Sequence, residues 1–298
     1  MADKRMMLLV NPNAGRGGYK AVLGGILQVF CADGWQPTVF FTRNAGDAPF
    51  LVEQNAANYD MVVCMGGDGT LSEVCAGMIR SGTSERVPIG YIPLGTANDV
   101  ARTLGLSPRP LQAAKNLLKG QARPYDVGQF GADAFFTYVA AFGAFTEVSY
   151  ETPQEAKQAL GHMAYMLEGI RTLGKLTSYH AIVEYDDGVL DGDFIFGGVT
   201  NSTSVAGLVK LDDHAVDLAD GMFEVLLVRK PQDLLDLSDL VSAALSMDFS
   251  GPNISFLKSR EVRIMFSDPV AWTRDGEDGG KHRDVFIQNR HPGVNIIV

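Results

Sequence analysis

The sequence predicts an α/β protein with two domains. An N-terminal domain built on a parallel sheet would span residues 1–125, and a C-terminal antiparallel β-sandwich with helical inserts would span residues 126–292. In the first part, short apolar runs alternate with stretches of helical periodicity, and each strand-helix-strand unit is long enough for a right-handed crossover. In the second part, runs typical of β-strands follow one another between turn signals.

The elements of the first domain follow from this alternation. Its helix at 19–32, for example, is predicted by Leu23, Ile26, Leu27 and Phe30, which recur at helical spacing. The expected strands are 6–10, 36–41, 61–65 and 89–92, and the expected helices are 19–32, 48–57, 71–79 and 98–104.

The second domain contains mostly strands. They are expected at 135–142, 178–185, 194–199, 223–228, 261–266, 284–288 and 294–298, with helical inserts at 154–173 and 234–247. The pairs Asp187-Gly188 and Asp191-Gly192 are interpreted as turns between strands. The last strand, at 293–298, could belong to either domain.

Bulk composition limits the function classes. With 46% apolar and 20% charged residues, the chain of 298 residues is an ordinary globular protein. Its net charge of −10 argues against nucleic-acid binding, which normally requires a basic face. There is no apolar run of about 18 residues and no signal-peptide pattern, and the three cysteines fit neither a disulfide framework nor a zinc site. We therefore expect a cytoplasmic protein with reduced thiols.

Three loops rich in small residues each follow a predicted strand and precede a predicted helix. They are 11–18 (NPNAGRGG), 66–70 (GGDGT) and 93–99 (PLGTAND). Glycine lets backbone amides approach phosphate oxygens, and the carboxyl edge of a parallel sheet is where such folds bind ligands. One such loop alone is most often just a turn, but three together predict a phosphate-binding site. None of them is a P-loop or a dinucleotide fingerprint.

These motifs, GGDGT with NPNAGRG upstream and PLGTANDVAR downstream, resemble the diacylglycerol kinase and sphingosine kinase superfamily. The likeness is greatest to soluble bacterial diacylglycerol kinase-like lipid kinases. The resemblance implies a kinase that uses ATP and magnesium to phosphorylate a lipid hydroxyl, with diacylglycerol as the expected acceptor and phosphatidic acid as the product. No motif identifies the lipid itself.

The resemblance also implies which residues contact the nucleotide. Asp68 would in addition lie near the metal and take part in catalysis. Thr42 and Asn98 could instead cap helices. The residues assigned to nucleotide binding are Asn11, Asn13, Gly15, Thr42, Gly66, Gly67, Asp68, Gly69, Thr70, Thr96 and Asn98.

Phosphoryl transfer to an alcohol requires magnesium and a base that accepts the hydroxyl proton. On sequence alone, Asp275-Gly276-Glu277 is a turn followed by a solvated charge. The resemblance makes Glu277 the catalytic base, a role best served by a partly desolvated carboxylate. Asp126 is either an ordinary aspartate at the domain junction or, by resemblance, part of an aspartate-water-magnesium network.

The acidic stretch at 211–224 suggests a metal site. It does not fit an EF-hand loop, because Leu218 stands at the sixth position, where that loop needs glycine. The resemblance implies a turn that holds a structural magnesium ion. Asp220 would bind through its side chain, while Asp217 and Met222 would bind through their backbone carbonyls.

The lipid acceptor would be presented by a membrane surface, so we expect a transient, peripheral membrane association. The amphipathic stretch 154–173 could touch a bilayer, but such a stripe more often packs on its own sheet or on a dimer partner. A homodimer is compatible with the sequence, although no pattern specifies one.

Two other functions compete with the lipid kinase. A NAD kinase shares the GGDGT loop but should carry an Asn-Glu dipeptide after the second glycine-rich loop, and this sequence contains no such dipeptide. A catalytically inactive nucleotide-binding regulator would keep the fold without the chemistry. The intact GGDGT, Asp275-Gly276-Glu277 and Asp220-Gly221 sequences argue against it.

Overall fold

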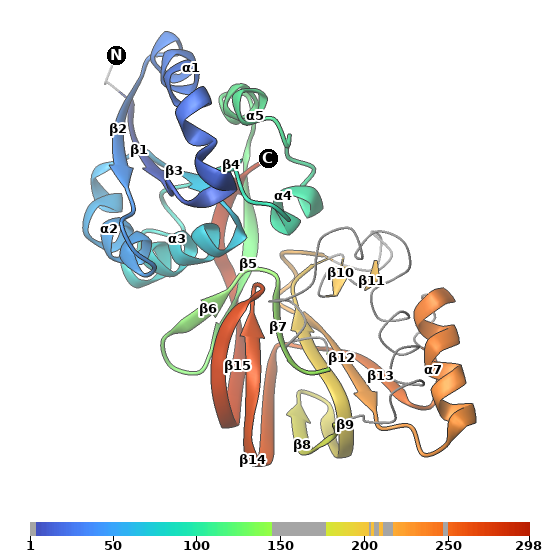
Figure 1. Cartoon of the computed structure of the whole chain (residues 1–298). Helices are drawn as coiled ribbons and strands as arrows, with labels where there is room; N and C mark the ends of the chain where they lie inside the picture. The colour runs from blue at the N-terminus through green and yellow to red at the C-terminus, as the bar shows by residue number, and fades with distance from the viewer. Residues whose placement is uncertain (1–3, 145–176, 203, 206–208, 211–216, 247–249) are drawn as a thin grey trace. The chain divides into compact units, whose positions relative to one another are not determined.

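A computed structural model describes residues 4–144, 177–202, 204–205, 209–210, 217–246 and 250–298 (Figure 1). The chain forms two compact units. The first comprises the chain up to Val127 together with Leu218–Asp220 and Arg290–Val298, and the second comprises Gly128–Asp217 and Gly221–Asn289. The mixed α/β class expected from the sequence is confirmed.

The first unit contains a sheet whose strands pair in parallel in the order β2, β1, β3, β4. The end of a late strand, β15 (Glu277–Ile297), pairs in parallel with β4 through Ile296 and Ile89. The four strands are β1 (Lys4–Val10), β2 (Trp35–Phe41), β3 (Met61–Gly66) and β4 (Ile89–Pro93).

Helices cover both faces of this sheet (Figure 1). In the figure, α1 and α5 lie on one face, while α2 and α3 lie on the other. Met6 and Leu8 pack with Ile26 of α1 in one apolar cluster, and Met7 and Leu9 alternate with them toward the opposite face. A sheet covered on both faces explains why its strands are continuous apolar runs. The helices are α1 (Tyr19–Ala32), α2 (Asp47–Asn55), α3 (Asp68–Arg80), α4 (Asp99–Thr103) and α5 (Pro110–Leu117).

Every strand expected in the first domain is present, but some boundaries differ from the prediction. Helix α3 begins at Asp68 instead of residue 71, so the GGDGT motif itself enters the helix. Two elements were not expected, namely α5 and β5 (Ala122–Phe130). Two short 3-10 helices lie at Ala14–Gly17 and Ala56–Asn58.

The second unit is built on antiparallel pairs. Strand β12 lies between β13 and β9, β14 pairs with β15, and both β7 and β8 pair with β9 and with β14. The division of these strands into two facing sheets stays a prediction. The strands are β6 (Ala134–Phe136), β7 (Val139–Gly143), β8 (Tyr179–Tyr185), β9 (Gly188–Thr200), β12 (Phe223–Arg229), β13 (Ile254–Ser259) and β14 (Glu261–Arg274), with a small pair β10 (Ser204–Val205) and β11 (Val209–Lys210).

Several predictions for this unit were wrong in detail. Strand β13 was not expected, β9 and β14 are longer than predicted, and the expected strands 284–288 and 294–298 are parts of one strand, β15. The expected strand 135–142 is divided at Thr137 and Tyr138, whose backbone groups bind elsewhere. Asp191-Gly192 is not a turn but lies inside β9, where Gly192 leaves room for the guanidinium of Arg229. The predicted helix 234–247 is present as α7 (Leu234–Ser246), and the predicted helix 154–173 lies outside the described residues.

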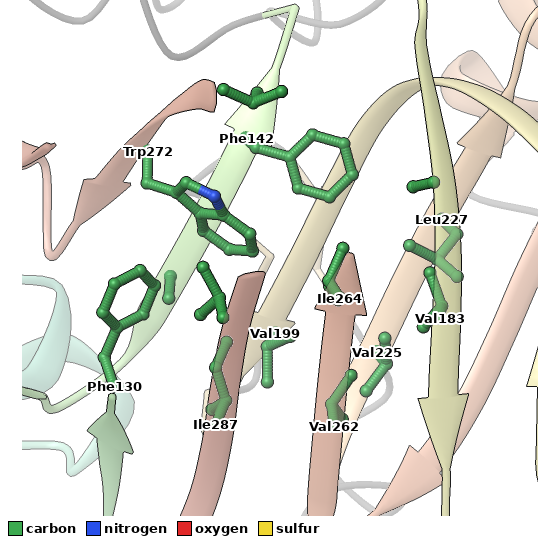
Figure 2. Packing of buried hydrophobic residues seen from close by; sticks show 14 of the residues in the cluster. Phe130, Phe142, Val183, Val199, Val225, Leu227, Val262, Ile264, Trp272 and Ile287 are labelled. Atoms are coloured by element: carbon green, nitrogen blue, oxygen red, sulfur yellow. The ribbon is translucent and has the colours of Figure 1, made fainter. Parts of the chain in front are cut away.

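Trp272 occupies the core of the second unit. Figure 2 shows its indole between the rings of Phe130 and Phe142, whose centroids lie 5.2 and 5.1 Å from it. Such edge-to-face and tilted contacts add to the burial of apolar area. Among the helices of the described residues, none is both long and apolar enough to cross a membrane.

Candidate active site

Asn11 fastens the first loop to the second one. It follows the last residue of β1, and its N–H donates to the carbonyl of Met65 at 3.0 Å. Its side-chain Nδ2 donates to the hydroxyl of Thr70 at 2.9 Å, while its Oδ1 accepts the N–H of Asn13 at 2.9 Å. One asparagine therefore orders its own loop and joins it to GGDGT.

The glycines of the three loops allow the loops to pack against each other. A Cβ atom on Gly15 would lie 2.2 Å from the carbonyl oxygen of Leu94, and one on Gly95 would lie 2.8 Å from the Cα of Gly67. Within the second loop, a Cβ atom on Gly66 would lie 2.6 Å from the Cβ of Thr70. The sequence predicts that these glycines leave room for a phosphate. In the structure, Gly15 and Gly95 leave room for the backbone of a neighbouring loop.

Asp68 joins the second loop to the third. Its Oδ2 accepts the N–H of Asp99 at 2.8 Å, and its Oδ1 accepts the N–H of Val100 at 3.2 Å and the hydroxyl of Tyr91 at 3.3 Å. Burial is the main cause that raises the pKa of Tyr91, and the nearby Asp68 carboxylate adds to it. Asp68 is therefore the side chain that caps α4, and Tyr91 is a neighbour that the sequence did not reveal.

Asn98 does not cap α4 with its side chain, contrary to one interpretation of the sequence. It precedes the helix with a φ of 50°, and its Nδ2 donates to the carbonyl of Gly95 at 2.8 Å. Its Oδ1 is buried and accepts no hydrogen bond from the described residues. Asparagine tolerates this left-handed conformation better than most residues. It orders the third loop from within.

The remaining nucleotide candidates differ in exposure. Thr42 is buried, and its N–H donates to the carbonyl of Val10 at 3.0 Å, so it borders the first loop. Asn13, Gly15 and Thr96 are exposed and are free to meet a ligand. Gly69 lies in the first turn of α3. The structure thus brings the predicted nucleotide residues of the first unit to one edge of its sheet.

Asp126 is fully buried in β5, and its Oδ1 lies 2.7 Å from Nδ1 of His291. Its N–H donates to the carbonyl of Leu218 at 2.9 Å, which brings it to the predicted metal turn. In that turn Asp217 and Asp220 are exposed, and Met222 is partly buried. No sequence signal pointed to His291, because its partner is 165 residues away.

Glu277 is the first residue of β15 and is exposed, not partly desolvated as expected for a base. The turn before it is built differently. Asp275 is buried, and its carboxylate accepts hydrogen bonds from the N–H groups of Thr137, Tyr138 and Val139. Burial raises the pKa of Asp275, and these hydrogen bonds oppose the increase.

An open pocket of about 720 Å³ lies elsewhere in the second unit. None of the predicted site residues lines it. Four of its nine lining residues are acidic, namely Glu184, Asp186, Glu261 and Asp284, and the others include Arg263 and Phe286. This concentration of carboxylates does not suit an acyl chain.

Known proteins similar to this chain are diacylglycerol kinases. Residues 5–130 match the model of the diacylglycerol kinase catalytic domain. The chain is 33% identical to a diacylglycerol kinase of Bacillus subtilis (strain 168), over 99% of this chain and 96% of that protein. It is 31% identical to a diacylglycerol kinase of Staphylococcus epidermidis, over 93% of this chain and 87% of that protein.

Solved structures agree in fold. A crystal structure from Bacillus anthracis str. Sterne superposes with a TM-score of 0.80 at 24% identity, over 100% of this chain and 98% of that one. A diacylglycerol kinase of the same organism gives a TM-score of 0.74 at 21% identity, over 100% and 97% of the two chains. From its full-length likeness to the curated relatives, the chain belongs to the diacylglycerol kinase family of lipid kinases.

Proposed function

We propose that this lipid kinase transfers the γ-phosphoryl group of ATP to the free hydroxyl of diacylglycerol, in a magnesium-dependent reaction that yields phosphatidic acid. The observation that carries the proposal is the assembly of three loops at the edge of the first unit's sheet, tied together by Asn11, Asp68 and close glycine contacts. The acceptor is supported by the full-length relatives, which are diacylglycerol kinases.

In this proposal the first domain, residues 1–125 with the returning strand at 293–298, binds ATP. Exposed Asn13, Gly15 and Thr96 contact the phosphate side, and the N-terminus of α3 favours negative charge there. Loops that are already hydrogen-bonded to each other lose little conformational entropy when the nucleotide binds. The second domain, residues 126–292, binds the lipid acceptor, which a membrane surface presents.

The residues of the metal turn fit magnesium in their chemistry. The carboxylate of Asp220 and the backbone carbonyls of Asp217 and Met222 are hard oxygen donors, which magnesium prefers, and the carboxylate of Asp126 would join them through water. Within the described part of the chain, no cluster of three or more His, Cys, Asp or Glu side chains could hold a metal. An ion in this turn would therefore take backbone carbonyls and water beside few carboxylates. When bound, magnesium neutralises phosphate charge.

Glu277 accepts the proton of the acceptor hydroxyl as that oxygen attacks the γ-phosphorus. The bond from the γ-phosphorus to the oxygen that bridges it to the β-phosphate breaks, and ADP leaves. Its exposed carboxylate is accessible to a substrate. Asp68, whose oxygens bind the amides of α4, holds the second and third loops in one arrangement around the phosphates. General-base catalysis of this kind typically contributes about 10²- to 10⁴-fold to the rate.

The test is transfer of radiolabel from γ-labelled ATP, with magnesium, to diacylglycerol micelles, sphingosine micelles or NAD in parallel. We expect label in diacylglycerol, its loss on chelation of magnesium, and a fall in kcat of about 100-fold or more in Glu277→Gln. Asp268→Asn is the matched control, because that side chain is 92% exposed and 3.8 Å from its partner Arg283. This control should retain wild-type kcat.

Other outcomes would change the proposal in defined ways. Label only in NAD would replace the lipid acceptor by a dinucleotide. Label in diacylglycerol that persists in Glu277→Gln would keep the substrate and remove the base. Absence of label from all three acceptors would favour a nucleotide-binding regulator.

A further inference from the structure

The turn that carries Glu277 is anchored by a buried charge. Asp275 is 8% exposed, and its Oδ2 accepts the N–H of Thr137 at 2.7 Å and the hydroxyl of Thr137 at 2.9 Å. Its Oδ1 accepts the N–H groups of Tyr138 at 3.0 Å and Val139 at 3.1 Å. Three consecutive amides and one hydroxyl thus point at a single carboxylate.

The main chain of Asp275 is held by the same segment. Its N–H donates to the carbonyl of Val139 at 2.9 Å. Asp275 and Gly276 have φ angles of 49° and 82°, as in the tight two-residue turns that join antiparallel strands. A Cβ atom on Gly276 would lie 3.4 Å from the hydroxyl of Tyr138, so that phenol borders the turn. The residue that follows is Glu277.

The segment 137–139, which binds Asp275, is also hydrogen-bonded to the end of β9. The carbonyl of Tyr138 accepts the hydroxyl of Thr200 at 2.5 Å and the N–H of Asn201 at 3.0 Å. Thr137, Thr200 and Asn201 are all fully buried. The turn therefore rests on a platform that is hydrogen-bonded to the end of β9, and it has little freedom to move on its own.

Burying a carboxylate without a cation is costly, and a two-residue turn does not require one. Among the described residues, the hydrogen bonds of Asp275 all go to the segment 137–139, and they fix the direction in which the side chain of Glu277 leaves the turn. We infer that Asp275 is a positioning residue, whose carboxylate holds the turn so that Glu277 meets the acceptor hydroxyl. The inference rests on the proposed role of Glu277 as the base.

The test is a double-mutant cycle with Glu277. In Asp275→Asn, an amide NH₂ faces N–H donors, so the turn must shift; displacement of a catalytic group by about 1 Å can cost about 100-fold in rate. We expect kcat for diacylglycerol phosphorylation to fall by about 10- to 100-fold with an unchanged KM for ATP. In the Glu277→Gln background, the same substitution should lower kcat by less than about twofold.

The matched control is Asp186→Asn. Asp186 also accepts two backbone amides, from Arg260 at 2.9 Å and Glu261 at 3.3 Å, at another turn of the second unit. It should leave kcat unchanged. If Asp275→Asn does not fold, Thr137→Val removes one of the four bonds and should lower kcat by about tenfold or less, while Thr137→Ser keeps the hydroxyl and restores it.

The outcomes separate the two ideas. Wild-type kcat in Glu277→Gln would overturn the base and the positioning role together. Suppose that kcat is low in Glu277→Gln and that Asp275→Asn lowers kcat by the same factor in the wild type and in Glu277→Gln. This result would keep Glu277 as the base and overturn the positioning role of Asp275. Equal losses of kcat in Asp275→Asn and Asp186→Asn would reduce Asp275 to a residue needed only for stability.

Discussion

Asp68 combines two tasks in one side chain. The family resemblance places it near the metal, yet both of its oxygens already accept hydrogen bonds, from two amides of α4 and from Tyr91. Its first contribution is therefore to hold the third loop against the second. Any contact with metal or phosphate would be made by a carboxylate whose orientation the protein has already fixed.

The substitution Asp68→Ala should lower both stability and ATP affinity. It removes a helix cap and leaves the buried hydroxyl of Tyr91 without this acceptor, which together should cost about 2–4 kcal/mol of unfolding free energy. Because the third loop is released, we expect ATP affinity, measured by calorimetry, to fall by about tenfold or more. Lipid phosphorylation should be lost.

Asp233→Ala provides the matched control for Asp68. Asp233 also caps a helix through two amides, those of Leu235 at 2.8 Å and Asp236 at 2.9 Å, but at the start of α7. This variant should lose about 1 kcal/mol of unfolding free energy and bind ATP as tightly as the wild type. Unchanged ATP affinity in Asp68→Ala would contradict the role of Asp68 in the loop assembly.

Site residues could be predicted from the sequence where they lie within a recognisable motif. Asn11, Asp68 and Thr70 lie in recognisable loops, and the structure brings them together. The hydrogen-bonding partners of Asp275 and Asp126 were missed for a physical reason. Asp275 binds an amide 138 residues away and Asp126 a histidine 165 residues away, so no local pattern records either pair.

Among the elements, the three loops act as one packed assembly because glycine removes the side chains between them. Gly15 has a φ of 56°, and its missing Cβ would overlap the carbonyl of Leu94. The conformation of the first loop therefore depends on the third loop, which Asp68 holds. Nucleotide affinity should respond to packing between loops as well as to direct contacts.

The substitution Gly15→Ala tests this packing. It adds a Cβ that would lie 2.2 Å from the oxygen of Leu94, in a backbone conformation that costs alanine about 1–2 kcal/mol. We expect the KM for ATP to rise by about tenfold while circular dichroism stays that of a folded protein. Gly34→Ala is the control, since its φ is 83° and no atom lies within 4 Å of its Cβ. An equal effect of both variants on KM would refute the packing argument.

The predictability of elements follows from burial. Strands β1, β3 and β4 are buried on both faces and were apparent as apolar runs, whereas α5 is short and was missed. The length of β14 was underestimated because Asp268-Pro269 interrupts its pattern. In the structure, the pairing shifts between Met265 and Val270, which takes this dipeptide out of the ladder.

In the whole molecule, the end of the chain completes the first unit. Ile297 joins the apolar cluster of Met6 and Leu8, and Val298 and Gln121 exchange two backbone hydrogen bonds. The sequence left this strand unassigned, because an apolar run fits either unit equally well. The first unit therefore cannot complete its core until the chain has passed through the second.

The stability of the whole molecule should fall in acid through carboxylates that the fold keeps ionised. Arg263 donates two hydrogen bonds to Asp284, at 2.9 and 2.7 Å, and these bonds and its charge lower the pKa of Asp284. Hydrogen bonds from two backbone amides lower the pKa of Asp47. A group whose pKa is lower in the folded state stabilises the protein above its unfolded pKa, about 4 for aspartate, and this stabilisation is lost as the pH falls through the folded pKa.

Asp284→Asn removes one such group. The free energy of unfolding of this variant should therefore be lower than that of the wild type at neutral pH, and the difference should shrink as the pH falls below about 4. Urea unfolding at a series of pH values measures this difference. The control is Asp268→Asn, because that aspartate is almost fully exposed and lies 3.8 Å from Arg283, so its removal should change unfolding little at any pH. A deficit in Asp284→Asn that stays constant down to about pH 3 would mean that the Arg263 pair contributes by packing alone, and that the acid sensitivity of the fold arises from other carboxylates.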